Sequence, residues 1–298
     1  MVRDDGTMRA RVYRYIHQVT SPTRRQVSWF DLIEIGLVAF GFLLYFIVRG
    51  AVVDRTGEAL ANSRAIIEVQ KAAGLLFEPS LNAWTMDASW RIDYFNWVYF
   101  WLDFPLIVSV GLFLFFKSRF HYTLLRDALL ISGGLALIMY VSYPVAPPRY
   151  LPEWGFVDTL EQYANLSYQA QSMAPFVNPY AAVPSLHVGW SVLLAFVVFM
   201  ATKNPLARAA VLAVLGSQFL AVMATANHYF FDTLIGTLVC VIALMIALWL
   251  QSAGYPRIRE FFGRRASELE ARQAVALAEA LTLNSLPAED GEPETVSA

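Results

Sequence analysis

The stretch ANHYFFDTLIGTLVCVIALMIALWL, residues 226–250, decides the fold class of this chain. From Phe230 to Leu250 it is mostly apolar, and about 20 such residues form a helix that crosses about 30 Å of hydrocarbon. Its polar residues gather at the start, where His228 and Asp232 lie four positions apart. The pattern predicts a membrane-spanning helix with a polar site at one end.

The whole composition agrees with lipid as the solvent. Of 298 residues, 57% are apolar and only 15% are charged, whereas a soluble domain is about 45–50% apolar and about 25% charged. The net charge of −2 and the lack of a basic face argue against a nucleic-acid partner. The single cysteine, Cys240, lies in an apolar run, which excludes a disulfide framework and a thiolate metal site.

Five further stretches have spanning length, so the sequence predicts an all-α, polytopic membrane helix bundle with six transmembrane helices. The expected spans are Trp29–Val48, Tyr94–Phe116, Leu124–Val145, Val183–Ala201, Leu206–Ala226 and Phe230–Leu250. They make residues 29–252 one membrane domain, with two long loops at 51–93 and 146–182. A basic tail precedes it at 1–28, and a polar helix with an acidic, disordered tail follows at 253–298.

Orientation follows from the basic residues, which concentrate on the cytoplasmic side of membrane proteins. With both termini cytoplasmic, 16 of the 22 Lys and Arg residues lie inside. The two long loops are then on the outer face, and the N-terminus, which lacks a signal-peptide pattern, is a retained cytoplasmic tail. We expect an integral membrane protein whose outer face carries both long loops.

Local patterns predict helices outside the spans. In the first outer loop, apolar spacing favours a helix from about Gly57 to Leu76, ended by Glu78-Pro79, which lies on the outer surface of the bilayer or caps the bundle. In the C-terminal region, Ser267 and Glu270 have the spacing of a capping box that opens a helix ending near Leu283.

Three polar clusters fall at the outer ends of spans, which is the strongest indication of a site. One contains Arg149 and Tyr150, the second is Pro184-Ser185-Leu186-His187, and the third runs from Asn227 to Asp232. Each has an ordinary structural explanation, such as a helix cap, a satisfied His–Asp pair or a lipid-headgroup anchor. Their occurrence on one face of the membrane favours a functional site.

Each cluster suits phosphoryl chemistry. Asp232 can accept the Nδ1 proton of His228 and aim Nε2 as a nucleophile, because residues four apart share a helix face. Pro184 suits the first turn of a helix, whose N–H groups near Ser185 and Leu186 can bind phosphate oxygens. His187 can act as a general acid, and the guanidinium of Arg149 can bind phosphate.

These residues resemble the type 2 phosphatidic acid phosphatase superfamily. Pro184-Ser185-Leu186-His187 is similar to its Pro-Ser-x-His motif, and His228 with Asp232 to its final His-x-x-x-Asp. The bacterial branch that resembles the fungal inositol phosphorylceramide synthases (the aureobasidin-resistance proteins) is nearest, with Pro147-Pro148-Arg149 at its arginine motif. The likeness runs from about Asp31 to Leu250.

The resemblance implies a metal-independent enzyme without a cofactor, acting on a lipid phosphate, diphosphate or phosphodiester. His228 would form a phosphohistidine, Asp232 would orient it, and His187 would protonate the leaving oxygen. Arg149, Ser185 and Leu186 would hold the phosphate, with Asn227, Tyr150 and Asp103 behind them. Water, an alcohol or a sugar such as inositol would accept the phosphoryl group; the acceptor and the oligomeric state are undetermined.

The sequence departs from the superfamily pattern at two cations. Ser142 stands where the first motif has lysine, and Ala221-Val222 where the third has Ser-Arg. The branch shares this departure, which leaves Arg64, Lys71 and Arg91 of the outer loop as candidate replacements.

Asp103 supports the main alternative function. A carboxylate near mid-membrane costs at least about 2.5–3.5 kcal/mol, so it marks a functional position. In a straight helix it would lie about 13 Å below the outer end, bonded to a neighbour such as Ser142 or supporting the site. It equally fits a transporter or flippase of an anionic lipid with a histidine gate. A non-catalytic scaffold is a third possibility.

Overall fold

The computed structural model describes residues 5–19, 35–36, 38–41, 43, 55–163 and 180–284. Within these ranges the chain is helical and has no β-strand, only an isolated bridge between Val145 and Ala181. The chain divides into two units, Met1–Arg24 with Ser252–Ala298, and Arg25–Gln251. The all-α prediction is therefore confirmed. Most of the expected span Trp29–Val48 and the acidic tail after Asn284 lie outside the described residues.

The smaller unit is a pair of helices, α1 (Asp5–Val19) and α13 (Tyr255–Asn284). Arg14 Nε donates to Glu270 Oε1 at 2.8 Å, and the rings of Tyr13 and Phe262 lie 5.3 Å apart. The predicted helix start at Ser267 was wrong, since α13 already begins at Tyr255 and the Ser267 hydroxyl donates to the Gly263 carbonyl. A serine in the sequence does not by itself mark the start of a helix, because inside a helix its hydroxyl can donate to the carbonyl four residues earlier.

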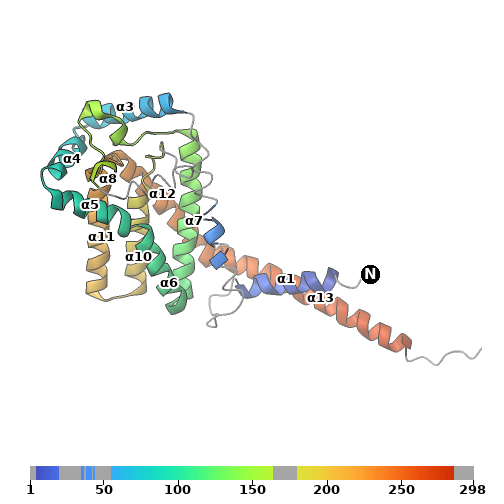
Figure 1. The fold of residues 1–298 in the computed structure, drawn as a ribbon. Helices are drawn as coiled ribbons and strands as arrows, with labels where there is room; N and C mark the ends of the chain where they lie inside the picture. Colours follow the sequence, from blue (N-terminus) through green and yellow to red (C-terminus); the bar gives the residue numbers. More distant parts are fainter. Residues whose placement is uncertain are drawn as a thin grey trace, which may run out of the picture. The chain divides into compact units, whose positions relative to one another are not determined.

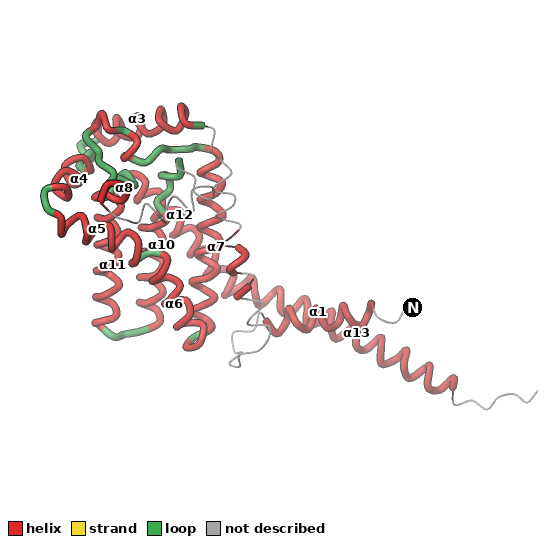
Figure 2. Tube along the Cα trace, in the orientation of Figure 1, coloured by secondary structure: helices red, strands yellow, loops and turns green. Residues whose placement is uncertain are grey.

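The larger unit holds the apolar helices. Figures 1 and 2 show α3 lying across one end, above the long helices that run away from it. In chain order its α-helices are α3 (Thr56–Ala72), α4 (Glu78–Met86), α5 (Ser89–Trp101), α6 (Phe104–Lys117), α7 (Arg119–Ser142), α8 (Thr159–Tyr163), α10 (Leu186–Ala201), α11 (Pro205–Ala224) and α12 (Phe230–Trp249). The end at which α10 and α12 begin is called the site end below.

Three helices among the described residues, beginning at Arg119, Pro205 and Phe230, are long and apolar enough to cross a membrane. The helices α5 and α6 qualify together as a fourth span, bent by 41°, and α10 is apolar but shorter. These helices make the chain an integral membrane protein, while six complete spans stay a prediction.

The expected single span Tyr94–Phe116 is broken in two. The helix α5 ends at Trp101, Asp103 has φ −106° and ψ −109°, and α6 starts at Phe104 with Pro105 in its first turn. Pro105 lacks the N–H that would bond to the carbonyl of Trp101, and its ring would clash with that carbonyl. A proline therefore sets the position of the break.

The first outer-loop prediction was right about a helix but wrong about its end. The helix α3 stops at Ala72, followed by Gly74 in the left-handed region at φ 70°, and Glu78-Pro79 opens α4 rather than ending α3. A proline is tolerated in the first turn of a helix, where its missing N–H costs no hydrogen bond. We call α3 and α4 the cap helices, because both lie at the site end (Figure 1).

Two glycines allow α10 and α12 to cross closely. A Cβ at Gly236 would lie 2.1 Å from the Ser185 carbonyl oxygen, and one at Gly189 would lie 2.5 Å from Cys240 Sγ and 2.7 Å from the Gly236 carbonyl. No side chain fits at such distances. The crossing brings the starts of α10 and α12, and so both predicted histidines, side by side.

Candidate functional site

His228 lies just before α12 and is almost completely buried. Its Nδ1 is 2.8 Å from the carbonyl oxygen of Ala182 and 3.4 Å from Asp232 Oδ2. Because a carbonyl oxygen only accepts hydrogen bonds, Nδ1 carries the proton and Nε2 carries the lone pair of the neutral ring. The expected His228–Asp232 pair is present, but the shorter contact is with the backbone of Ala182.

His187 lies in the first turn of α10, opposite His228. The two ring centroids are 5.7 Å apart. His187 Nε2 lies 3.3 Å from Asp103 Oδ2, and its ring stacks on Tyr99 with a centroid distance of 4.4 Å and an angle of 21°. The structure therefore places Asp103 at the site, while the Ser142 hydroxyl donates to the Ile138 carbonyl at 2.7 Å.

Ser185 is the N-cap of α10, which begins at Leu186. Pro184 precedes the cap, so the expectation that it occupies the first turn was wrong, because Ser185 is still in an extended conformation (φ −74°, ψ 100°). Both Ser185 and Leu186 are buried. The Ser185 hydroxyl has no hydrogen-bond partner among the described residues, and its side chain makes no capping bond.

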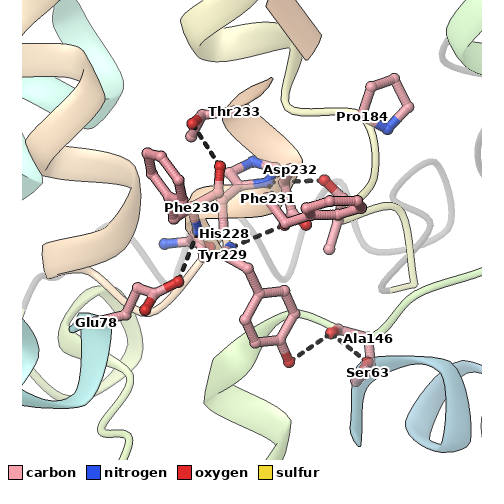
Figure 3. A network of polar contacts seen from close by, with 12 residues as sticks. Ser63, Glu78, Ala146, Pro184, His228, Tyr229, Phe230, Phe231, Asp232 and Thr233 are labelled. Carbon is pink, nitrogen blue, oxygen red and sulfur yellow. Dashed lines mark hydrogen bonds and ion pairs between the residues drawn. The ribbon is translucent and has the colours of Figure 1, made fainter. Parts of the chain in front are cut away.

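The start of α12 is bonded to side chains from three places, of which Figure 3 shows Asp232 and Glu78. Asp232 Oδ2 accepts from the Tyr229 N–H at 2.9 Å, and Glu78 Oε1 accepts from the Phe230 N–H at 2.7 Å. Gln70 Oε1 accepts from the Phe231 N–H at 2.9 Å, and its Nε2 donates to Glu78 Oε1. The cap helices thus supply acceptors for a helix start whose N–H groups have none of their own.

Arg149 is held next to the histidine segment. Its backbone N–H donates to the Ala226 carbonyl at 3.0 Å, its Nη1 donates to Asn227 Oδ1, and its Nε lies 3.3 Å from Asp158 Oδ2. Its guanidinium also lies 5.2 Å from the ring centre of Tyr150, which is exposed. The segment before α12 and the nearby Asp158 thus hold this cation next to Asn227, the residue that precedes His228.

The other candidate cations have different contacts. Arg64 pairs with Glu153 at 3.0 Å, Lys71 lies 5.5 Å from the ring centre of Trp154, and Arg91 lies 4.2 Å from that of Trp84. The backbone N–H of Glu153 and the Arg64 guanidinium lower the pKa of the Glu153 carboxyl. None of these contacts involves either site histidine.

The three residues that differ from the superfamily motifs, Ala221, Val222 and Ser142, lie in two different environments. Ala221 and Val222 are fully buried, and the Val222 carbonyl accepts from the N–H groups of Asn227 and His228. Ser142, in contrast, is exposed at the end of α7. In the part of the chain that the structure describes, no three His, Cys, Asp or Glu side chains gather as metal ligands would.

Comparison with known proteins supplies the family. A model of the PAP2 superfamily matches residues 64–246, more than half of the chain and a range that holds both histidines. The chain belongs to the PAP2 superfamily. Membership supports a function of the lipid phosphatase or phosphotransferase kind. No curated protein and no solved structure matches the chain.

The PAP2 assignment agrees with the motifs, but several contacts were not expected from them. Sequence reasoning missed Ala182, Glu78, Gln70 and Tyr99. The first contributes only a backbone carbonyl, which no residue type reveals. The others come from segments far from the motifs, and their only sign was a polar or aromatic residue on an otherwise apolar helix face.

Proposed function

We propose that this PAP2 protein is a lipid phosphatase or phosphotransferase that works through a phosphohistidine on His228. One observation carries the proposal: the rings of His228 and His187 lie 5.7 Å apart, and the Ala182 carbonyl fixes the proton of His228 on Nδ1. A nucleophile with its lone pair on Nε2 then lies next to a second imidazole that can transfer a proton.

The reaction has two steps. In the first, His228 Nε2 attacks phosphorus, the P–N bond forms, and the bond to the leaving oxygen breaks as the His187 imidazolium gives that oxygen its proton. In the second, neutral His187 removes a proton from water or an alcohol, whose oxygen attacks phosphorus and breaks the P–N bond. Asp232 stabilises the cationic ring of the intermediate from 3.4 Å.

The phosphate oxygens would bind at the start of α10. The unpartnered Ser185 hydroxyl and the N–H groups of the first turn, including that of Leu186, are donors at the positive end of the helix dipole. Arg149 would contribute a planar cationic donor from the side of Asn227. Such donors stabilise the charge that develops in phosphoryl transfer.

The substrate would reach the site from the bilayer. The helix α5 carries an exposed stripe at spacings of four, three and four residues, formed by Trp90, Tyr94, Trp97 and Trp101. Tryptophan and tyrosine concentrate at membrane interfaces, so this stripe supports placing the site end at the level of the lipid headgroups. The basic residues favour the outer face of a bacterial inner membrane, with six spans and cytoplasmic termini.

The choice of acceptor is the finer part of the proposal. Placement in the branch resembling inositol phosphorylceramide synthases rests on Ser142 and Val222 standing at the superfamily's two cation positions, and on Pro147-Pro148-Arg149 at the branch's arginine motif. It implies transfer of a phospho-headgroup to an alcohol such as inositol. The transporter alternative depended mainly on Asp103, whose contact with His187 supports a role beside the proposed general acid instead.

The test uses purified protein and radiolabelled dihexanoyl phosphatidic acid in the presence of EDTA. We expect His228→Ala to lower phosphate release by at least about 10³-fold and to abolish an acid-labile, base-stable phosphoprotein. The matched control is His121→Ala, which changes a histidine bonded to Ser118 at the start of α7 and should leave the rate within about twofold. Full activity of His228→Ala would refute the nucleophile assignment, and adding inositol distinguishes transfer from hydrolysis.

A further inference from the structure

The break between α5 and α6 faces His187. Of the two residues at the break itself, Leu102 and Asp103, the second directs a carboxylate oxygen to within 3.3 Å of His187 Nε2. Tyr99, one turn earlier on α5, stacks on the same ring at 4.4 Å. One contact fixes a ring nitrogen and the other fixes the ring plane, so this segment determines the orientation of the imidazole.

We propose that Asp103 is a positioning residue that orients His187 for proton transfer. The inference rests on the proposed function, in which His187 is the acid and then the base. With Nε2–H held on Asp103, Nδ1 is the ring nitrogen that passes the proton to the leaving oxygen and later takes one from the acceptor. The carboxylate also stabilises the imidazolium before transfer, as a nearby negative charge does.

The helices on either side of the break are themselves anchored. Asn96 of α5 and Thr159 of α8 exchange two buried hydrogen bonds, of 3.0 Å from Asn96 Nδ2 to the Thr159 carbonyl and 2.7 Å from Thr159 Oγ1 to Asn96 Oδ1. Pro105 fixes the break on the other side. Asp103 itself is buried. A buried carboxylate on a segment whose two flanking helices are fixed is suited to orienting a partner.

The two histidines therefore have parallel arrangements with different origins. His228 has Asp232 four residues later on the same helix, at 3.4 Å. His187 has Asp103 from a different helix pair, at 3.3 Å. A carboxylate behind each imidazole suits a reaction in which both rings become cationic in turn.

A leaving-group comparison tests this role. Protonation is required to expel the alkoxide of dihexanoyl phosphatidic acid, whereas the nitrophenolate of para-nitrophenyl phosphate leaves without it. In single-turnover experiments, Asp103→Asn should slow release of the lipid alcohol about 10²-fold and the burst of nitrophenolate less than about threefold. His187→Gln should show the same selectivity, and adding Asp103→Asn to it should cause no further loss.

Controls separate the possible outcomes. Asp103→Glu should recover part of the loss, and Asp93→Asn, an exposed carboxylate on the same helix α5, should behave as wild type. Equal losses on both substrates would overturn the positioning role and leave the proposed function standing. Wild type inactive on both would instead refute the proposed function.

A spectroscopic measurement tests the contact between Asp103 and His187 even if the wild type is inactive on both substrates. The chain has four histidines, so ¹⁵N-histidine spectra can be assigned by comparing single His→Gln variants. Asp103→Asn should move the Nε2 resonance of His187 and leave those of His17 and His121 in place. An unchanged His187 resonance would overturn the inference whatever the enzyme assays give.

Discussion

The helices α10 and α12 begin side by side with a histidine at each start, yet their first turns are used differently. The N–H groups of Tyr229, Phe230 and Phe231 at the start of α12 are all bonded to protein side chains. At the start of α10 the Ser185 hydroxyl is buried and has no hydrogen-bond partner within the described ranges. The comparison shows that protein acceptors occupy these N–H groups of α12, and it supports the proposal that a ligand binds at the start of α10.

The two helix starts differ in the free energy that an anion would gain by binding there. A buried hydroxyl without a partner costs about 1–3 kcal/mol, and a bound phosphate oxygen would remove that cost. At α12 an anion would have to compete with two carboxylates, Asp232 and Glu78, for the same N–H groups. This difference supports the proposal that the phosphate oxygens bind at the start of α10 while His228, held at the start of α12, attacks phosphorus.

The largest effect should come from separating the two helix starts. Gly236→Ala places a methyl group 2.1 Å from the Ser185 carbonyl oxygen, and such overpacking costs about 1–3 kcal/mol or more. We expect a lower melting temperature and a loss of activity of at least about 10²-fold, measured by thermal unfolding and phosphate release. Gly216→Ala on α11, where a Cβ meets nothing within 4 Å, is the control; normal activity of Gly236→Ala would show that the close crossing is dispensable.

A smaller effect tests the start of α10 alone. Ser185→Ala removes the unpartnered hydroxyl, so we expect turnover to fall about 10²-fold, in the range seen for one lost oxyanion donor. Inhibition by vanadate should weaken in parallel, because vanadate imitates the phosphoryl group. Thr233→Val removes a hydroxyl that donates to the Phe230 carbonyl in α12 and should leave vanadate inhibition unchanged. Equal vanadate inhibition of wild type and Ser185→Ala would contradict the assignment.

The smallest effect should appear at the start of α12. Glu78→Gln keeps an oxygen that can accept from Phe230 but removes the negative charge from the helix start, which is worth about 0.3–1 kcal/mol and more where buried. We expect the melting temperature to drop by a few degrees while vanadate inhibition stays within about twofold. Glu68→Gln, an exposed carboxylate of α3, is the control. A large change in vanadate inhibition would mean that α12 also binds the phosphate.

Much of this could be predicted from the sequence because membrane helices and helix starts have local patterns. The ends predicted for the last three spans lie within a few residues of those of α10, α11 and α12. The histidines share one end of the structure because both precede or open spans that start on the same side. These predictions needed only residue type and spacing.

The break at Asp103 was not predicted because the apolar pattern continues through it. A straight helix placed Asp103 about 13 Å deep, whereas the bend brings it to His187 in the first turn of α10. Pro105 was the available sign of a break, but prolines also occur in unbroken membrane helices. Contacts of Glu78 and Gln70 with α12 depend on tertiary packing, which spacing along the chain does not reveal.

The hydrogen bond from Phe230 to Glu78 joins residues 152 positions apart, and this separation sets an order of events during synthesis. The cap helices and Asp103 leave the ribosome before α12 is synthesised. The hydrogen bond between Glu78 and Phe230 can therefore form only after α12 has been made. Only when α12 inserts do the proposed nucleophile His228, its carboxylate and the acceptors for its helix start come together. Assembly of the proposed site therefore coincides with insertion of α12, and a shorter nascent chain exposes no His228.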